Sequence, residues 1–373
     1  MTKTNSFIEQ YSKNFIKNHT FLDVSDIVEY RKDQYTAEEI ERAMKLAGGK
    51  TDFKKMNEEF IKTVIRPFIE TLPEKEKMVL KDVQIEVLPT FEINASAVKG
   101  PDGKYVVVLH HQLLSALSNY NEAQFLSGLL MSSGTEKQLK QGFELLIDAN
   151  KEIMKCYKYK KYLPTFSRLP AILPRDFYLK SLEKTLIQEL FLVAHEYAHI
   201  YLGHLSETEK GPSNVQDDKF QAEQNVKRQR QELEADALAL KWIINAFKKE
   251  KHTLIFGIPN QEAIFYAAEV FMFLHIIEVN TNGYPEITKN SSLNNPLTTP
   301  EVLKRLLDLS LQLDQIKSGQ LADSKRKHPL ASIRLLSVIA VTQELLEKSE
   351  GSRIMDMLKD MVFYETFLIK EEF

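Results

Sequence analysis

The sequence contains a single cysteine, Cys156, and has no strong excess of charge of either sign. One cysteine excludes a disulfide within the chain and any metal site built from several cysteines, so a metal would need histidine and carboxylate ligands. With 49 basic and 52 acidic residues, the chain has no surplus of positive charge to neutralise a nucleic-acid backbone. We therefore expect no nucleic-acid partner.

The sequence also lacks a long apolar segment without charged residues. The two most apolar windows, residues 186–203 and 263–279, both contain glutamate and histidine, which are rare in a helix that spans a bilayer. The N-terminal residues have no apolar stretch of the kind found in signal peptides. Together with the single cysteine, these features predict a protein of the reducing cytoplasm that does not engage a membrane.

Most of the 373 residues show helical periodicity, with a short region of strand character. The segment VQIEV (83–87) alternates like a strand, and ASAVKGPDGKYVVVLH (95–110) predicts a hairpin that turns at residues 101–103. Long helices are expected at about residues 181–204, 221–248 and 263–279. The sequence thus predicts an α+β fold that is mainly helical and has a small β-sheet.

The motif HEYAH, from His195 to His199, lies in the middle of a long apolar helical segment. It fits the HExxH pattern of zinc peptidases, in which two histidines four residues apart share one face of a helix and can reach one metal ion. Glu196 would then project beside the ion, where it can take a proton from water and pass it to a leaving amine. We expect one Zn²⁺ per chain, with His195 and His199 as ligands and Glu196 as general base.

A third protein ligand must come from another part of the chain. The metzincin pattern requires Gly and His three and six residues beyond the second ligand, but Leu202 and Leu205 occupy those positions. His204 is one residue short of the required position, and we interpret it as a helix-end or surface histidine. A glutamate ligand, as in the gluzincins, fits the sequence better.

The segment ELEAD, 33 residues after His199, offers that glutamate in an ExxxD arrangement. Glu232 would bind the metal, and Asp236, one turn further on the same helical face, would accept the N–H of a ligating histidine. Glu234 points elsewhere by helical geometry. The segment could instead be acidic helix surface, but the leucines and alanines around it favour a helix packed against the core.

In its ordered motifs the chain resembles two kinds of known peptidase. VQIEV, Asn94-Ala95, YVVVLH, HEYAH, ELEAD and His328-Pro329 with Arg334 resemble the soluble core of the heat-shock and CAAX-prenyl membrane metallopeptidases. A closer resemblance, over about residues 103–340, is to the Lit family of phage-exclusion peptidases. It is carried by GKYVVVLHHQLLSALSNYN, VAHEYAHIYLGH, ELEADALALKWI, the apolar helix ending in EVN, and KHPLASIRLLSV.

The resemblance implies the same ligands and base, and it adds His328 and Arg334 as candidates for the site wall. His328 would stabilise the oxyanion, and Arg334 would brace Asp236 or a loop. The alternative for both is a helix-entry turn with a surface arginine. His110 and His111, which would follow an edge strand able to bind extended substrate, are more readily explained as structural residues.

By resemblance, the protein is a zinc endopeptidase that acts on a specific intracellular protein, with a translation factor as the substrate class, in phage defence or a stress response. Residues 81–373 would form the gluzincin catalytic domain. Residues 1–80, a helical region outside the resemblance, would select the substrate or regulate the enzyme, and an activating or inhibiting partner is expected. Two alternatives stay open: a housekeeping or maturation peptidase, and a metal-stabilised sensor or interaction module whose site is occluded or inactive.

Overall fold

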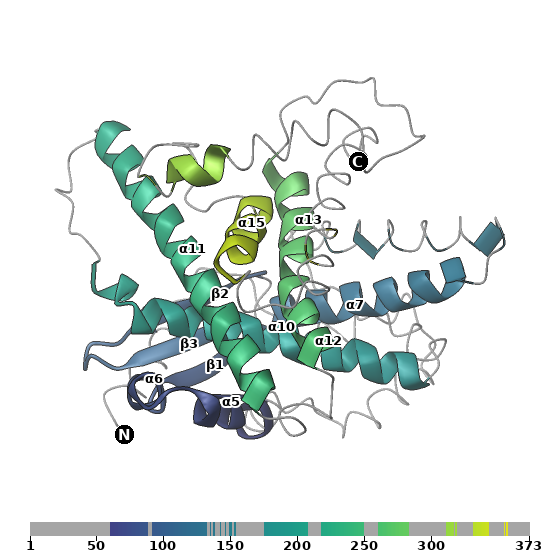
Figure 1. The fold of residues 1–373 in the computed structure, drawn as a ribbon, viewed down its shortest axis with the longest axis horizontal. Helices are drawn as coiled ribbons and strands as arrows, with labels where there is room; N and C mark the ends of the chain where they lie inside the picture. The colour runs from purple at the N-terminus through teal and green to yellow at the C-terminus, as the bar shows by residue number, and fades with distance from the viewer. Residues whose placement is uncertain are drawn as a thin grey trace, which may run out of the picture. The chain divides into compact units, whose positions relative to one another are not determined.

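The structure is a computed structural model that describes residues 60–88, 92–132, 175–207, 218–249, 260–282, 311–316 and 331–342, together with isolated positions within 135–153, 318 and 354–356. The fold is mainly helical with a small three-stranded sheet, as the sequence predicted (Figure 1). Most of the predicted N-terminal region and His328 lie outside the described residues. None of the described helices is long and apolar enough to cross a membrane.

The chain divides into two compact units, and the division falls inside one helix. The described residues of Met1–Glu70 and Lys77–Glu189 form the first unit, and those of Thr71–Glu76 and Leu190–Phe373 form the second. The dividing point, between residues 189 and 190, lies in α10, which runs over Arg175–Tyr201. The second half of α10, which carries HEYAH, therefore belongs to the second unit.

The sheet in the first unit has the strand order β1-β3-β2 (Figure 1). Strands β2 (Ala95–Lys99) and β3 (Tyr105–His110) form the predicted antiparallel hairpin, whose turn places Gly103 at a φ of 80°. This left-handed conformation suits glycine because it has no Cβ. Strand β1 (Gln84–Leu88) pairs with β3 in parallel.

Strand β3 is the central strand of this sheet, so the expectation that it lies at an edge is wrong. Its run of β-branched and leucine side chains, Val106 to Leu109, is buried at 2% exposure or less, as is usual for a strand covered on both sides. His110 ends this strand and is itself buried. With both its neighbours in place, β3 has no free edge to which an extended substrate could add.

Besides the first half of α10, the first unit contains further helical segments. They comprise a π-helical turn, η1 (Ile61–Ile65), followed by the start of α5 (Arg66–Thr71), the later part of α6 (Glu74–Leu80), and the long helix α7 (His111–Ser132). Pro67 stands at the second position of α5, where its missing N–H is tolerated. Hydrogen bonding changes from π- to α-helical at this point of the chain.

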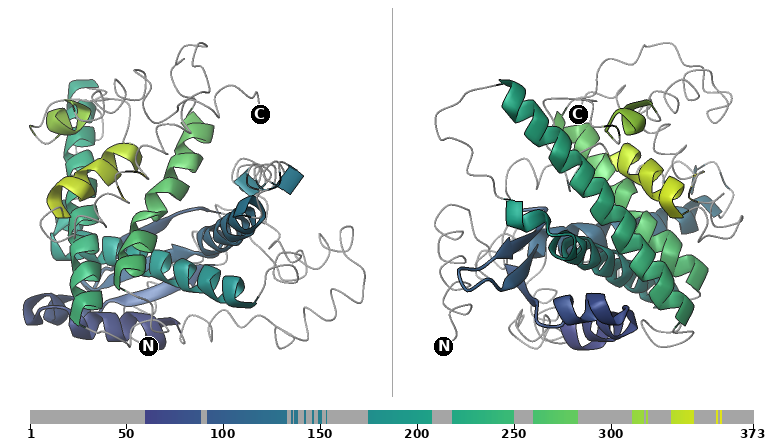
Figure 2. Two further views of the ribbon diagram at one scale, coloured as in Figure 1. Left: turned by 45° about the vertical axis from the view of Figure 1, so that its right-hand side comes forward. Right: turned by 60° about the vertical axis from the view of Figure 1, so that its left-hand side comes forward.

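The second unit is built on α11 (Asp218–Lys249), which contacts α12 (Asn260–Ala268) and α15 (Ala331–Thr342) (Figures 1 and 2). Helix α13 (Val270–Asn282) contacts α15 as well. The single apolar helix expected at 263–279 is thus two helices separated at Glu269. The Glu269 carbonyl accepts a hydrogen bond from the Met272 N–H at 3.0 Å, a tighter i+3 bond that interrupts the α-helical pattern without proline or glycine.

Candidate metal centre

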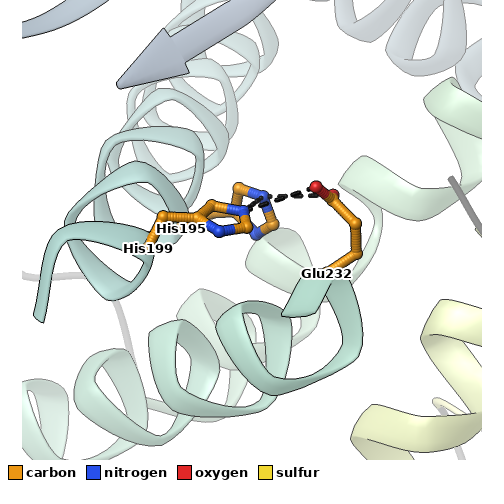
Figure 3. Close-up of side chains that lie close together, drawn as sticks. All are labelled: His195, His199 and Glu232. Atoms are coloured by element: carbon orange, nitrogen blue, oxygen red, sulfur yellow. Dashed lines mark hydrogen bonds and ion pairs between the residues drawn. The ribbon is translucent and has the colours of Figure 1, made fainter. Parts of the chain in front are cut away.

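The two histidines of HEYAH lie one turn apart on α10, and their rings point toward the Glu232 carboxylate on α11 (Figure 3). The two Nε2 atoms are 3.0 Å apart. Glu232 places Oε2 at 3.5 Å from Nε2 of His195 and Oε1 at 3.5 Å from Nε2 of His199. Three residues that sequence analysis assigned as ligands are therefore brought together within the second unit.

These three residues can hold a metal ion. Ligands 2.0–2.1 Å from a tetrahedral zinc ion are separated by about 3.4 Å, close to the 3.0–3.5 Å between the donor atoms here. The side chains are mostly buried, but those of His199 and Glu232 keep 11% and 13% of their surface exposed. The candidate metal site is thus not completely closed to solvent.

Asp236 holds the far side of the His195 ring. Its Oδ1 lies 2.9 Å from Nδ1 of His195, and its side chain is completely buried. An ionised carboxylate only accepts hydrogen bonds, so it favours a proton on Nδ1 and leaves the Nε2 lone pair directed at the metal position. The structure thus places Asp236 where the sequence analysis expected a carboxylate that fixes the tautomer.

Arg334, near the start of α15, neutralises the buried Asp236. Its Nε donates to Oδ2 and its Nη2 to Oδ1, both at 2.7 Å, and Nη2 is also 3.5 Å from Oε2 of Glu232. Burial opposes ionisation of Asp236, but Arg334 and, after it, His195 together outweigh burial and hold the pKa of the carboxyl below its ordinary value. Arg334 thereby fixes two carboxylates of α11 from a second helix.

The electrostatic field of this cluster favours a positive charge between the rings. Burial alone would lower the pKa of His195, but Asp236 and then Glu232 overcome it and raise that pKa to about 10. The same carboxylates attract a divalent cation, which competes with the proton for Nε2. The donor set of two imidazoles and one carboxylate is the one expected for a catalytic zinc ion with an open coordination position.

Glu196 follows His195 on α10 and is 8% exposed. In a helix it is turned about 100° from His195 and about 60° from His199, so it projects to one side of the two histidines. His328, the expected oxyanion residue, lies outside the described residues, and its role stays a prediction. Only the main chain of His111 is described, and the buried His110 belongs to the sheet of the first unit.

A contact that sequence analysis missed involves His204. Helix α10 ends at Tyr201, and Gly203, two residues later, has a left-handed φ of 77°. The chain then forms the short helix η2 (His204–Glu207). His204 Nδ1 lies 2.9 Å from His199 Nδ1, so the interpretation of His204 as a mere helix-end residue overlooked a partner of a ligand. Glycine just beyond a helix end is a known signal for such a chain reversal.

His204 also reaches α11. Its Nε2 is 3.4 Å from Oε2 of Glu234, while its side chain is only 8% exposed. Burial and the neighbouring His199 lower the pKa of His204. Glu234, which the sequence analysis expected to point elsewhere, thus lies near the candidate metal centre through this second histidine.

A protein-family model described as Peptidase U49 matches residues 104–289. The match supports a peptidase. It covers just under half of the chain and includes His195, Glu196, His199, Glu232 and Asp236, but it ends before Arg334. Comparison with curated proteins gave no match, and comparison with solved structures gave none either.

Proposed function

We propose that this protein is a zinc-dependent endopeptidase of the gluzincin type. The observation that carries the proposal is the convergence of His195, His199 and Glu232 at 3.0–3.5 Å, with Glu196 directly after His195 on α10. The Peptidase U49 match supports hydrolysis of peptide bonds. A structural zinc site has no need for an acid–base group such as Glu196, and this favours an enzyme over a metal-stabilised binding module.

A zinc ion bound by these three residues would act as a Lewis acid on the scissile carbonyl and acidify the attacking water. Glu196 then accepts the proton of that water and delivers it to the leaving amine, so the proton released in the first step is used in the second. Asp236, held by Arg334, favours a proton on Nδ1 of His195, so that Nε2 is the nitrogen left to bind the ion. In this proposal Glu196 transfers the proton, and Asp236 and Arg334 position the His195 ring.

We further propose that the substrate is a specific intracellular protein, with a translation factor as the first class to test and phage defence as the setting. Support comes from the resemblance to the Lit family, and the cytoplasmic location follows from the same resemblance and the single cysteine. Selection of the target by residues 1–80 is part of this proposal.

The decisive experiment compares wild type with Glu196→Gln and Glu232→Gln. Zinc per chain is measured in each purified protein, and new protein N-termini are followed in cells that express each one. We expect one zinc ion in wild type and Glu196→Gln, loss of zinc in Glu232→Gln, and new N-termini with wild type alone. Glu223→Gln, an exposed change on the same helix as Glu232, is the matched control.

Two results would count against the proposal. Absence of bound zinc in wild type would remove the metal centre on which it rests. Equal cleavage by wild type and Glu196→Gln would show that the hydrolysis does not depend on this glutamate. General acid–base catalysis contributes about 10²–10⁴-fold, so a real loss is easily detected.

A further inference from the structure

We propose that His204 is a positioning residue for His199, and that Glu234 sets the proton arrangement of His204. The inference rests on the proposed function, because it assigns these residues to the metal ligand. It concerns the side of His199 that faces away from the metal position. On that side the Nδ1 atoms of the two histidines are 2.9 Å apart.

One proton must lie between the two Nδ1 atoms, and its position decides whether His199 can bind metal. If His199 carries it, the Nε2 lone pair of His199 is free for an ion; if His204 carries it, neutral His199 holds its proton on Nε2. The first arrangement requires His204 to keep its own proton on Nε2. The two arrangements contain the same number of protons.

Glu234 selects the first arrangement. Its carboxylate accepts but does not donate, and its Oε2 lies 3.4 Å from Nε2 of His204. It therefore favours a proton on that nitrogen, which leaves Nδ1 of His204 as an acceptor for the N–H of His199. The chain of contacts from Glu234 through His204 to His199 thus orients the ligand ring and its lone pair.

The two metal-binding histidines are consequently supported in different ways. His195 contacts the fully buried Asp236 directly. His199 is linked to its carboxylate only through the imidazole of His204, and that carboxylate, Glu234, is 52% exposed. The rings of His199 and His204 meet edge to face, with centroids 5.0 Å apart. The support of His199 is therefore the one open to solvent, at the turn that Gly203 creates.

The test uses the full chain and two readouts, zinc affinity from chelator competition and two-bond ¹H–¹⁵N spectra of the histidine rings in metal-free protein. His204→Phe keeps a ring but removes the acceptor. His204→Asn restores an acceptor oxygen near the position of Nδ1. Glu234→Gln is an exposed change that spares the fold, and Glu223→Gln removes a negative charge elsewhere on α11 as the control.

In wild type we expect the His199 proton on Nδ1. His204→Phe should convert His199 to a mixture of tautomers and weaken zinc binding by about 10–100-fold, the range for groups that orient a ligand. His204→Asn should recover most of the zinc affinity. Glu234→Gln should lose less zinc affinity than His204→Phe but show the same change in the His199 spectrum. Glu223→Gln should match wild type in both measurements.

Unchanged zinc affinity and spectra in His204→Phe would overturn the proposal. Equal losses of zinc affinity in His204→Phe and His204→Asn would overturn it too, because they would show that His204 acts by packing alone. The proposed function fails separately. If wild type binds no zinc, the metal-free spectra still show where the His199 proton lies, and a proton on Nε2 there would overturn the positioning role as well.

Discussion

Arg334 donates a hydrogen bond to each oxygen of the Asp236 carboxylate, both at 2.7 Å. Because Asp236 is completely buried and also contacts His195, this pair links α15 to α11 and, through the histidine, to α10. The geometry is that of a two-point guanidinium–carboxylate contact, which specifies orientation as well as charge. A change at Arg334 should therefore affect both stability and the metal centre.

Replacement of Arg334 by methionine should lower the free energy of unfolding by about 3–5 kcal/mol, because it leaves a buried carboxylate without its cation. The contribution of Asp236 has a defined pH dependence. Its pKa is lowered in the folded protein, so the stabilisation is present above the unfolded value of about 3.9 and is lost as pH falls below it. Urea unfolding at pH 3 to 7 measures both effects.

Arg230→Met is the control for this prediction. Arg230 is 50% exposed and lies 4.0 Å from Glu234, and exposed pairs of this kind contribute about 0–1 kcal/mol. If Arg334→Met and Arg230→Met lose similar free energy of unfolding, the buried Arg334–Asp236 pair does not stabilise the fold more than an exposed pair does.

Removal of metal should destabilise the second unit. A ligand that binds only the folded state stabilises it by about 2.7 kcal/mol at a free concentration one hundred times its Kd. We expect a chelator to lower the Tm of the purified protein and added zinc to restore it. In His195→Ala, His199→Ala and Glu232→Gln the zinc-dependent part of the Tm should disappear, whereas Glu223→Gln should keep it. A zinc response that survives in His199→Ala would place the ion elsewhere.

The sequence was most informative where spacing along one helix decides the geometry. HEYAH and ELEAD follow helical periodicity, so the positions of His195, His199, Glu232 and Asp236 relative to one another within each helix were predictable. The hairpin could also be predicted, because its turn residues are local to it.

Contacts between distant segments were harder to predict. The parallel pairing of β1 with β3 joins residues 22 positions apart, Gln84 and Val106, and no local pattern reports it. The interruption at Glu269 changes hydrogen bonding without changing the apolar pattern. The partnership of His204 with His199 depends on how the chain turns at Gly203, and helical spacing carries no information beyond the helix end.

Two carboxyl groups of the first unit should give its stability an unusual pH dependence. Burial raises the pKa of Glu189 on α10 to about 8 and that of Glu122 on α7 to about 7, the latter despite a hydrogen bond from Ser118. Both values lie above that of an unfolded glutamate, so the folded state binds more protons from about pH 4.3 upward. Stability should therefore fall as pH rises through this range.

Glu189→Gln should remove its share of that slope, at most about 1.4 kcal/mol per pH unit for a single proton. Urea unfolding of wild type, Glu189→Gln and Glu122→Gln between pH 5 and 8.5 provides the measurement. For Glu122→Gln, the slope of stability against pH should differ from that of wild type mainly below pH 7. Glu223→Gln, on an exposed part of α11, should retain the wild-type slope, and identical slopes in all four proteins would refute the assignment.

Phe271, on α13, is a completely buried ring that contacts the Arg334 guanidinium. Its centroid is 5.4 Å from that of Phe191 on α10, in an edge-on arrangement, and 5.6 Å from the Arg334 guanidinium carbon. Truncation should therefore open a cavity and also release the arginine that holds Asp236.

Phe271→Ala should cost about 3–5 kcal/mol of unfolding free energy, a typical value for a buried phenylalanine, and should weaken zinc binding. Phe271→Leu, which retains more of the volume, should lose less stability but should also weaken zinc binding, because it lacks the aromatic face under Arg334. Leu311→Ala, at a position 53% exposed, serves as the control and should change stability by less than about 0.5 kcal/mol. Full zinc affinity in Phe271→Ala would show that Arg334 keeps its place without the ring.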